Sequence, residues 1–353
     1  MSVFVAGTAL TLLTPDGGWI VLAVLRIVVG IGVGRLNIVS VPYVQEFVPR
    51  KQRGFLAGLG SVFIHVGLLI GSLAQKAVGA DWRMLVLLGC IPALLLIWLA
   101  FVPKSPRFLQ SRGREQDARA SLAWALQVPV DRVGALPAHQ PAAENTTYRV
   151  LFSTYLTSLL VVTIGSFSFI MGGFAIQSWG QTLLGEGFGF FADTVANLFI
   201  VVSLADLLGR LSAAWLADVI GRRYVMLGYG LLGAAGCFLA VASAGNAWMF
   251  FAGITIAMAF GDGAFGVLNP FGAEQFPTSA RSTGLGLGYG TGATAKIIGP
   301  LIMGAAIGGN IVKQSVTLAV IAPCFAFFGI CFLVGAITYL FAKETRDTPL
   351  EQV

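Results

Sequence analysis

The chain has 353 residues, of which 56% are hydrophobic and only 11% are charged, and its mean hydropathy is +0.83. This apolar content excludes an ordinary water-soluble enzyme or binding domain, which would aggregate, and it indicates a membrane protein. The formal net charge of +6 does not indicate a nucleic-acid partner, because most basic residues gather in loops between apolar stretches.

Apolar stretches long enough to cross a bilayer, about 20 residues each, recur along the chain. We predict nine membrane spans preceded by a partial span at 3–13. The nine lie near 18–41, 55–78, 84–102, 150–178, 194–217, 224–243, 246–270, 283–308 and 315–341. All four cysteines fall inside these spans, where we expect them to act as small apolar side chains rather than as disulfide partners or metal ligands.

A polar, proline-containing stretch at 103–149 interrupts this pattern and includes a helix predicted near 111–127. We interpret the stretch as a cytoplasmic linker between an incomplete N-terminal helical bundle at 1–102 and a complete six-helix bundle at 150–343. A cytoplasmic tail follows at 344–353. Fifteen of the 22 lysines and arginines fall on the side of the linker, and the positive-inside rule makes that side cytoplasmic. The sequence thus predicts a multi-pass protein of the cell membrane.

One pattern of four residues occurs twice, with a constant separation of 228 positions. The two copies are Pro42, Glu46, Pro49 and Arg53, and Pro270, Glu274, Pro277 and Arg281. The last proline of each copy cannot continue an ordinary helix, so both copies mark the cytoplasmic end of a span. A carboxylate at a helix C-terminus is unfavourable unless a cation meets it. Each glutamate is therefore predicted to have a basic partner.

Several stretches together resemble the major facilitator superfamily, in particular its sugar-porter and metabolite:proton-symporter branches. They are RIVVGIGVG at 26–34, both copies of the repeated pattern, WR at 82–83, PKSPRFL at 103–109, LADVIGRR at 216–223 and KETRDTPLE at 343–351. The resemblance implies an all-α polytopic fold of two pseudo-symmetric six-helix bundles that work by alternating access. It also implies that the N-terminal bundle lacks counterparts of the first two family helices.

The resemblance further implies a charge network at the cytoplasmic ends of the helices. Its members here are Glu46, Arg53, Arg107, Asp218, Arg222, Arg223, Glu274 and Arg281. Glu274 is expected to meet Arg222 or Arg223. Because the first copy of the Asp/Gly/Arg/Arg loop has no counterpart here, Glu46 would need Arg53 or Arg107 instead.

Charged residues inside the spans are the candidates for function, because each costs a few kcal/mol in hydrocarbon without a partner or a cavity. Asp262 lies twelve residues before Glu274 and Arg35 eleven before Glu46, which at about 1.5 Å per residue places both near the middle of the bilayer. We predict that Asp262 binds a coupling proton and that Arg35 attracts an anionic substrate. The alternative is that the two pair across the halves as a structural lock, or that they face a packed interior with backbone carbonyl partners.

The remaining ionisable groups in the spans have two interpretations each. Arg26 matches a family arginine that assists proton movement or holds a helix contact. His65 either relays protons or makes an interhelical hydrogen bond. Lys296 either contacts the substrate or reaches along the helix to the interface. Asp206 and Arg210, four residues apart, predict a local ion pair on one helix face.

The span that contains SFSFIMGGFAIQSWGQTLL at 166–184 provides candidate cavity residues. Gln177, Trp179, Phe167 and Phe169 are predicted to line the cavity, although aromatic residues also serve ordinary packing. This stretch lacks the paired glutamines that sugar porters usually carry and is more similar to the metabolite symporters, with small residues before a tryptophan.

The sequence contains none of the usual enzyme motifs, such as a Walker lysine, a nucleophile elbow or a histidine and cysteine metal cluster. We therefore predict a protein that is not an enzyme and that needs no cofactor or metal. The leading hypothesis is a monomeric proton symporter for a small organic metabolite, preferably an organic anion or aromatic acid, with the substrate, the proton and the lipid bilayer as partners. A sugar symporter or facilitator is the alternative of the same class, and a non-transporting truncated membrane protein is the alternative of another class.

Overall fold

The computed structural model describes residues 2–47, 53–79, 81–99, 101–134, 148–277, 280–308 and 314–345. Within these ranges the regular structure is entirely helical, which confirms the predicted all-α fold class. The chain divides into two compact units, one of residues 1–60 and 77–141 and one of residues 61–76 and 142–353. The predicted domain boundaries at 102, 149 and 343 stay a prediction.

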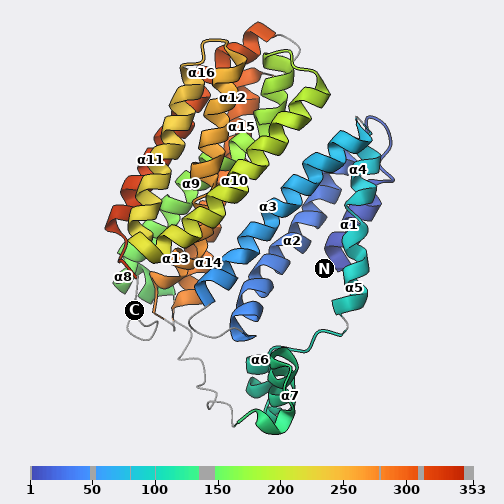
Figure 1. The fold of residues 1–353 in the computed structure, drawn as a ribbon, viewed down its shortest axis with the longest axis vertical. Helices are drawn as coiled ribbons and strands as arrows, with labels where there is room; N and C mark the ends of the chain where they lie inside the picture. The colour runs from blue at the N-terminus through green and yellow to red at the C-terminus, as the bar shows by residue number, and fades with distance from the viewer. Residues whose placement is uncertain are drawn as a thin grey trace. The chain divides into compact units, whose positions relative to one another are not determined.

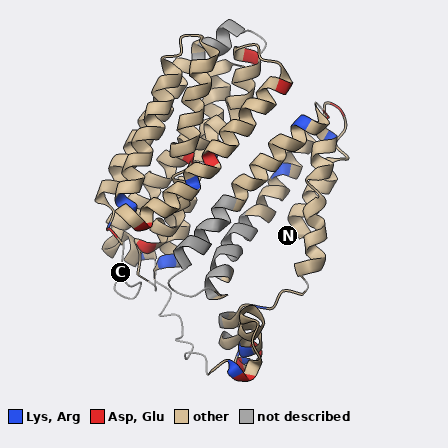
Figure 2. Ribbon diagram, in the orientation of Figure 1, with Lys and Arg blue, Asp and Glu red and all other residues tan. Residues whose placement is uncertain are grey.

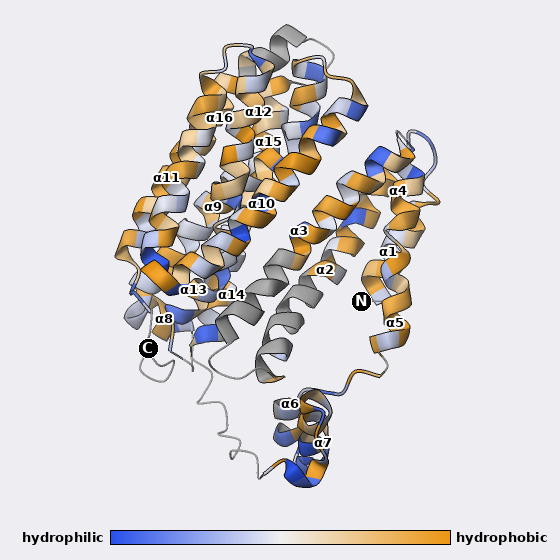
Figure 3. Cartoon of the chain, viewed as in Figure 1, coloured by the Kyte–Doolittle hydropathy of each residue, from blue (hydrophilic) through white to orange (hydrophobic). Residues whose placement is uncertain are grey.

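Seven helical segments of the described part are long and apolar enough to cross a membrane. They are Trp82–Leu99, Leu156–Gly187, Ala192–Ile220, Arg222–Val241, Ala247–Glu274, Thr283–Ile307 and Ile321–Phe341. Shorter apolar helical segments occur at Ser2–Thr11, Trp19–Val33 and Phe63–Val78. Hydrophobic residues occur along the whole length of these helices (Figure 3), and many large apolar side chains are exposed, as expected where lipid replaces water.

The first unit begins with α1 (Ser2–Thr11) packed against α2 (Trp19–Phe47). Glycine permits the close approach, because a Cβ on Gly32 would lie only 2.6 Å from the backbone nitrogen of Phe4. The apolar helices α4 (Trp82–Leu88) and α5 (Leu94–Leu99) follow α3 along the chain, joined by a 3-10 turn at Ile91–Ala93. Asp81 caps α4 by accepting hydrogen bonds from two backbone amides of its first turn.

Two polar helices, α6 (Pro106–Ser111) and α7 (Glu115–Leu126), complete the described part of the first unit together with a 3-10 turn at Val130–Arg132. They confirm the helix predicted near 111–127, with a later start. The chain turns at Gly113, whose φ is +72°, and so separates α7 from α6. Ser121 donates to the carbonyl oxygen of Lys104 at 2.7 Å and fixes α7 to the preceding segment.

The second unit is a bundle of long helices (Figure 1). Residues 61–76 of α3 (Arg53–Val78) also belong to this unit. Its other helices are α8 (Tyr148–Thr154), α9 (Leu156–Thr182), α10 (Ala192–Ile220), α11 (Arg222–Val241), α12 (Ala247–Ile256), α13 (Phe265–Glu274), α14 (Arg281–Gly292), α15 (Ala295–Ile307) and α16 (Gln314–Thr338). A π-helical segment, η4 (Leu183–Gly187), extends α9, and the 3-10 turn η6 (Tyr339–Phe341) extends α16. Helix α9 packs against α14, α15 and α16, and α11 packs against α12 and α16.

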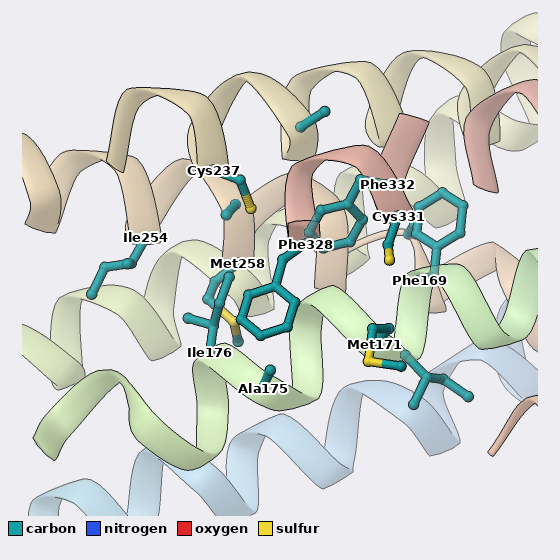
Figure 4. Packing of buried hydrophobic residues seen from close by; sticks show 14 of the residues in the cluster. Phe169, Met171, Ala175, Ile176, Cys237, Ile254, Met258, Phe328, Cys331 and Phe332 are labelled. Carbon is teal, nitrogen blue, oxygen red and sulfur yellow. The ribbon is translucent and has the colours of Figure 1, made fainter. Parts of the chain in front are cut away.

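Phenylalanine side chains set against glycines form the centre of this bundle (Figure 4). Phe332 of α16 lies so close to α9 and to the α12–α13 span that a Cβ on either Gly172 or Gly261 would come within 2.4 Å of its ring. The ring also meets Phe169 edge-on, with centroids 5.8 Å apart. Shape complementarity of this kind drives helix association where lipid removes the hydrophobic effect.

Helix α10 makes its closest approach to a π-helical segment, η5 (Ala257–Asp262), which joins α12 to α13 within one long span. A Cβ on Gly209 would lie 1.7 Å from the carbonyl oxygen of Ala259, and a Cβ on Gly263 would lie 3.0 Å from the backbone carbonyl carbon of Gly209. Only glycine fits at these positions. Backbone contact therefore places the end of η5 directly against the middle of α10.

We expect Gly209→Ala to lower the free energy of unfolding by about 1–3 kcal/mol, because the added methyl group overpacks this contact. The matched control is Gly228→Ala on α11, where an added Cβ meets nothing within 4 Å. That variant should be neutral or more stable by up to about 1 kcal/mol. Reversible unfolding of the purified protein in SDS measures both variants, and equal stabilities would contradict the close approach.

Candidate functional site

Four ionisable side chains meet inside the second unit, and three different segments supply them. His65 comes from α3, Asp206 and Arg210 from α10, and Asp262 from the end of η5. Each side chain is at most 6% exposed. Figure 2 shows charged residues both at the ends of this bundle and part-way along it. We call these four residues the buried charge cluster.

Asp262 is the best-partnered member of the cluster. One of its carboxylate oxygens, Oδ2, accepts a short hydrogen bond from Nη2 of Arg210. The same oxygen accepts from Nε2 of Gln177 at 3.2 Å and lies 3.1 Å from Nε2 of His65. Donors that converge on one oxygen favour the ionised carboxylate, as in other charge-assisted hydrogen bonds.

Asp206 has weaker contacts. Its Oδ1 accepts a 3.3 Å hydrogen bond from Nε of Arg210, the residue four positions later on the same helix. Its Oδ2 lies 2.9 Å from Nε2 of His65. The predicted local ion pair is therefore present, but it forms part of a larger group of charges.

Local sequence explains why the four side chains come together. Asp206 and Arg210 share one face of α10 because residues four apart lie one turn from each other. The π-helical segment widens the helix at Asp262, and such segments are frequent at functional sites. Gly173 of α9 leaves room for the carboxylate, since a Cβ there would lie 2.5 Å from Oδ1 of Asp262.

The cluster carries an excess of negative charge when the imidazole is neutral, because two carboxylates face one guanidinium. One additional proton makes it neutral. The ligand atoms of His65, Asp206 and Asp262 lie within 4.8 Å of one another, a spacing that a metal ion can use. The Arg210 guanidinium contacts both carboxylates, however, and supplies the positive charge that a metal would bring. The arrangement therefore suits a proton better than a metal ion.

Two of the three predicted proton-coupling residues, Asp262 and His65, lie together in this cluster. Arg26 lies on α2 in the other unit and is exposed there. The sequence analysis did not nominate Asp206 and Arg210 as functional residues. The sequence feature that could have indicated a functional role for these two residues is a pair of opposite charges within an apolar span. The same feature is also expected of an isolated structural ion pair.

The predicted substrate-binding residues lie on two helices of the second unit and one of the first. Gln177 of α9 contacts the cluster through Asp262. Trp179, also on α9, donates from Nε1 to the carbonyl oxygen of Pro300 at 3.2 Å. Lys296 of α15 is exposed, and its Nζ lies 5.7 Å from the centroid of the Phe174 ring. The backbone of Arg35 belongs to α2, but its side chain lies outside the described part of the structure.

The prediction that Phe169 lines a cavity is wrong. Instead of lining a cavity, it is fully buried in the bundle core against Phe332 and Tyr339. The sequence could not distinguish the two roles, because adjacent faces of a membrane helix carry the same residue types. Phe167 is partly buried and packs against the edge of this core.

A second polar group lies at the end of the bundle that the repeated pattern marks. Glu274, the last residue of α13, forms an ion pair with Arg222 of α11 and accepts a 2.6 Å hydrogen bond from Thr345. Arg281 at the start of α14 donates to the carbonyl oxygen of Ala273, one of the last carbonyls of α13. Basic groups thus meet the acidic helix end, as helix electrostatics require.

The segment after the last helix also contacts this polar group. Glu344 accepts hydrogen bonds from the backbone amides of Arg222 and Arg223 and so caps α11, whose N-terminal amides have no intrahelical partner. Asp218 lies nearby in the sequence, exposed at the end of α10. The side chains of the other predicted network members, Glu46, Arg53 and Arg107, lie outside the described residues.

Comparison with known proteins identifies the class as a polytopic membrane transporter and not an enzyme. The family described as "Sugar (and other) transporter" matches residues 1–353. The niacin transporter NiaP of Acinetobacter baylyi is 27% identical over 367 residues, which cover 99% of this chain and 79% of NiaP. The cis,cis-muconate transport protein of the same organism is 26% identical over 330 residues, covering 92% of this chain and 73% of that protein.

Among solved structures, the E. coli proton:xylose symporter XylE superposes with a TM-score of 0.73 at 22% sequence identity. The match covers 95% of this chain and 74% of XylE. The chain belongs to the sugar (and other) transporter family, and its fold is that of the major facilitator symporter XylE. The predicted resemblance is thereby confirmed, and a small-molecule substrate and alternating access follow from the family.

We expect Glu274→Gln to lower the free energy of unfolding by about 1.5–3 kcal/mol, the usual range for hydrogen bonds to a charged group. The change removes the negative charge that holds Arg222 and Thr345 at a side chain only 13% exposed. Glu186→Gln, at an exposed position in η4, is the matched control and should change little. Reversible unfolding in SDS gives the free energy of unfolding of both variants. If this free energy is the same in Glu274→Gln as in the wild type, the network contributes nothing to stability.

Proposed function

We propose that the protein is a proton-coupled symporter of a small organic anion, with an aromatic carboxylate as the preferred substrate. The observation that carries the proton coupling is the buried charge cluster, in which Asp262 and His65 lie 3.1 Å apart and one guanidinium faces two carboxylates. An unbalanced negative charge in a low-dielectric site is costly, so binding a proton there is favourable. Arg26 remains a predicted contributor on the basis of the family resemblance.

The preference for an anion rests on basic side chains and on the relatives. Arg35 and Lys296 are the predicted positive groups for a carboxylate, with Gln177 and Trp179 as further substrate contacts. NiaP is named for niacin, a pyridine carboxylic acid, and a second relative is named for cis,cis-muconate, a dicarboxylate. A sugar remains the second candidate, because XylE is a xylose symporter of the same fold.

We further propose that the carrier is a monomer in the cell membrane. Its Glu274 network, its linker and its C-terminus would lie on the cytoplasmic side. The distribution of lysine and arginine supports this placement. In this orientation the Glu274 network closes the cytoplasmic side of the bundle, while the buried charge cluster lies deeper along the same span.

Uptake by proteoliposomes tests the function and the substrate class together. With the outside one pH unit more acidic, a 1:1 symporter should drive uptake of radiolabelled nicotinate toward a ratio of about tenfold, because one pH unit is a tenfold ratio of proton concentrations. The measured quantity is the initial rate in excess of that in protein-free liposomes, since the neutral acid also crosses lipid unaided. Glucose and xylose should not accumulate. Accumulation of a sugar but not of nicotinate would favour the second candidate, and no dependence of any uptake on pH would reject proton coupling.

Asp262→Asn should abolish uphill uptake but leave counterflow exchange intact. Without this carboxylate, Asp206 and Arg210 balance each other and the cluster no longer needs a proton. Asp193→Asn, an exposed residue in the first turn of α10, is the matched control and should accumulate substrate normally. Proton-driven accumulation that survives in Asp262→Asn would exclude the proposed role of this residue.

A further inference from the structure

We infer that Asp206 is the carboxylate that takes up the coupling proton, shared with His65, while Asp262 stays ionised as the partner of Arg210. This inference rests on the proposed function and specifies it further. It assigns Asp206 a role beyond the local ion pair that its spacing from Arg210 predicts.

The two carboxylates differ in how many donors stabilise their charge. Among the described residues, Oδ2 of Asp262 meets Arg210, Gln177 and His65, and its contact with Arg210 is short. In the described part of the chain, Asp206 meets Arg210, at 3.3 Å, and His65. Because hydrogen bonds and positive charge favour the ionised form, the less stabilised carboxylate is the one that accepts a proton first.

The position of the His65 imidazole indicates that His65 and Asp206 share one proton. Nε2 of His65 lies 2.9 Å from Oδ2 of Asp206, and two atoms so close need a proton between them. Nη2 of Arg210 lies 3.0 Å from the same nitrogen, so the guanidinium can donate to Nε2 when that nitrogen carries no proton. When Asp206 carries the proton, its hydroxyl competes with this guanidinium for the single lone pair of Nε2. When Nε2 carries the proton, it donates to the Asp206 carboxylate instead.

Other groups near the cluster do not change which carboxylate is less stabilised in its ionised form. Tyr289 of α14 and Lys296 of α15 lie within electrostatic range of Asp262. The side chain of Lys296 is exposed, and its ammonium nitrogen lies 5.7 Å from the centroid of the Phe174 ring. Gln177 of α9 is uncharged. The charges in direct contact are therefore those of His65, Asp206, Arg210 and Asp262.

The proton step follows from this arrangement. A proton enters while the cluster is open to the outer solution and converts the Asp206 carboxylate to a carboxylic acid, or equivalently converts His65 to an imidazolium beside ionised Asp206. Either form brings the cluster to neutrality, which lowers the cost of closing the site away from water. Opening to the cytoplasm hydrates Asp206 and releases the same proton. One proton per cycle is expected.

Infrared difference spectroscopy of the purified protein between acidic and alkaline pH tests the inference without any substrate. The wild type should show the carbonyl band of a buried protonated carboxylic acid, and Asp206→Asn should lose it while Asp193→Asn keeps it. Asp206→Glu should restore a band, shifted in frequency. Persistence of the wild-type band in correctly folded Asp206→Asn, as judged by size-exclusion chromatography and circular dichroism, would overturn the inference.

Transport measurements provide the second readout. Nicotinate counterflow by Asp206→Asn should lose its pH dependence, and the initial rate of uptake above that of protein-free liposomes should no longer rise when a one-unit pH gradient is imposed. A merely structural role would lower counterflow equally at all pH values, which would count against the inference. If Asp262→Asn loses coupling and Asp206→Asn keeps it, the proton resides on Asp262, and the proposed function stands without this refinement.

The same vesicles distinguish a metal ion from a proton. Uptake driven by a sodium or divalent-cation gradient at equal pH on both sides, and lost in Asp206→Asn, would show that the cluster binds a cation in place of the proton. If wild-type transport responds to no gradient while the infrared band is present and depends on Asp206, the proposed symport fails but the protonation site is supported.

Discussion

The close contact between α10 and the π-helical segment η5 is the constraint on which the rest of the second unit depends. It buries two carboxylates and a guanidinium together, where separately each would carry a large desolvation cost. Glycines at 209 and 263 make the contact possible. A residue with a side chain at either position would push η5 outward and leave Arg210 without its strongest partner.

The bundle core and the buried charge cluster use the same packing principle. Phe332 fills a space between two glycines, just as Asp262 occupies the space that Gly173 leaves. In lipid, helices gain nothing from excluding water, so shape and hydrogen bonds must hold them together. Glycine at positions 172, 173 and 261 is thus a requirement of helix packing.

The polar group at the end of the bundle shows how a short terminal segment contributes to the fold. Lys343 and Gln275 exchange two hydrogen bonds, and Glu344 caps α11. The end of α16 is thereby tied to α11 and α13. In a carrier that works by alternating access, contacts of this type stabilise one of the alternating states, and they must break for the opposite state to form.

The membrane class, the approximate spans and the family could all be predicted from the sequence alone, the family in part from the repeated Pro/Glu/Pro/Arg pattern. These follow from composition, span length and local helix chemistry, which depend on neighbours in the chain. The sequence also identified Asp262 and His65 as candidates, because charge in an apolar span is costly wherever it lies. Only the tertiary structure decided that Arg210 pairs with Asp262, that Asp206 faces His65, and that Phe169 is core. The rotation of each helix and the depth at which helices cross set these contacts, and periodicity in one helix contains no information about the helix that faces it.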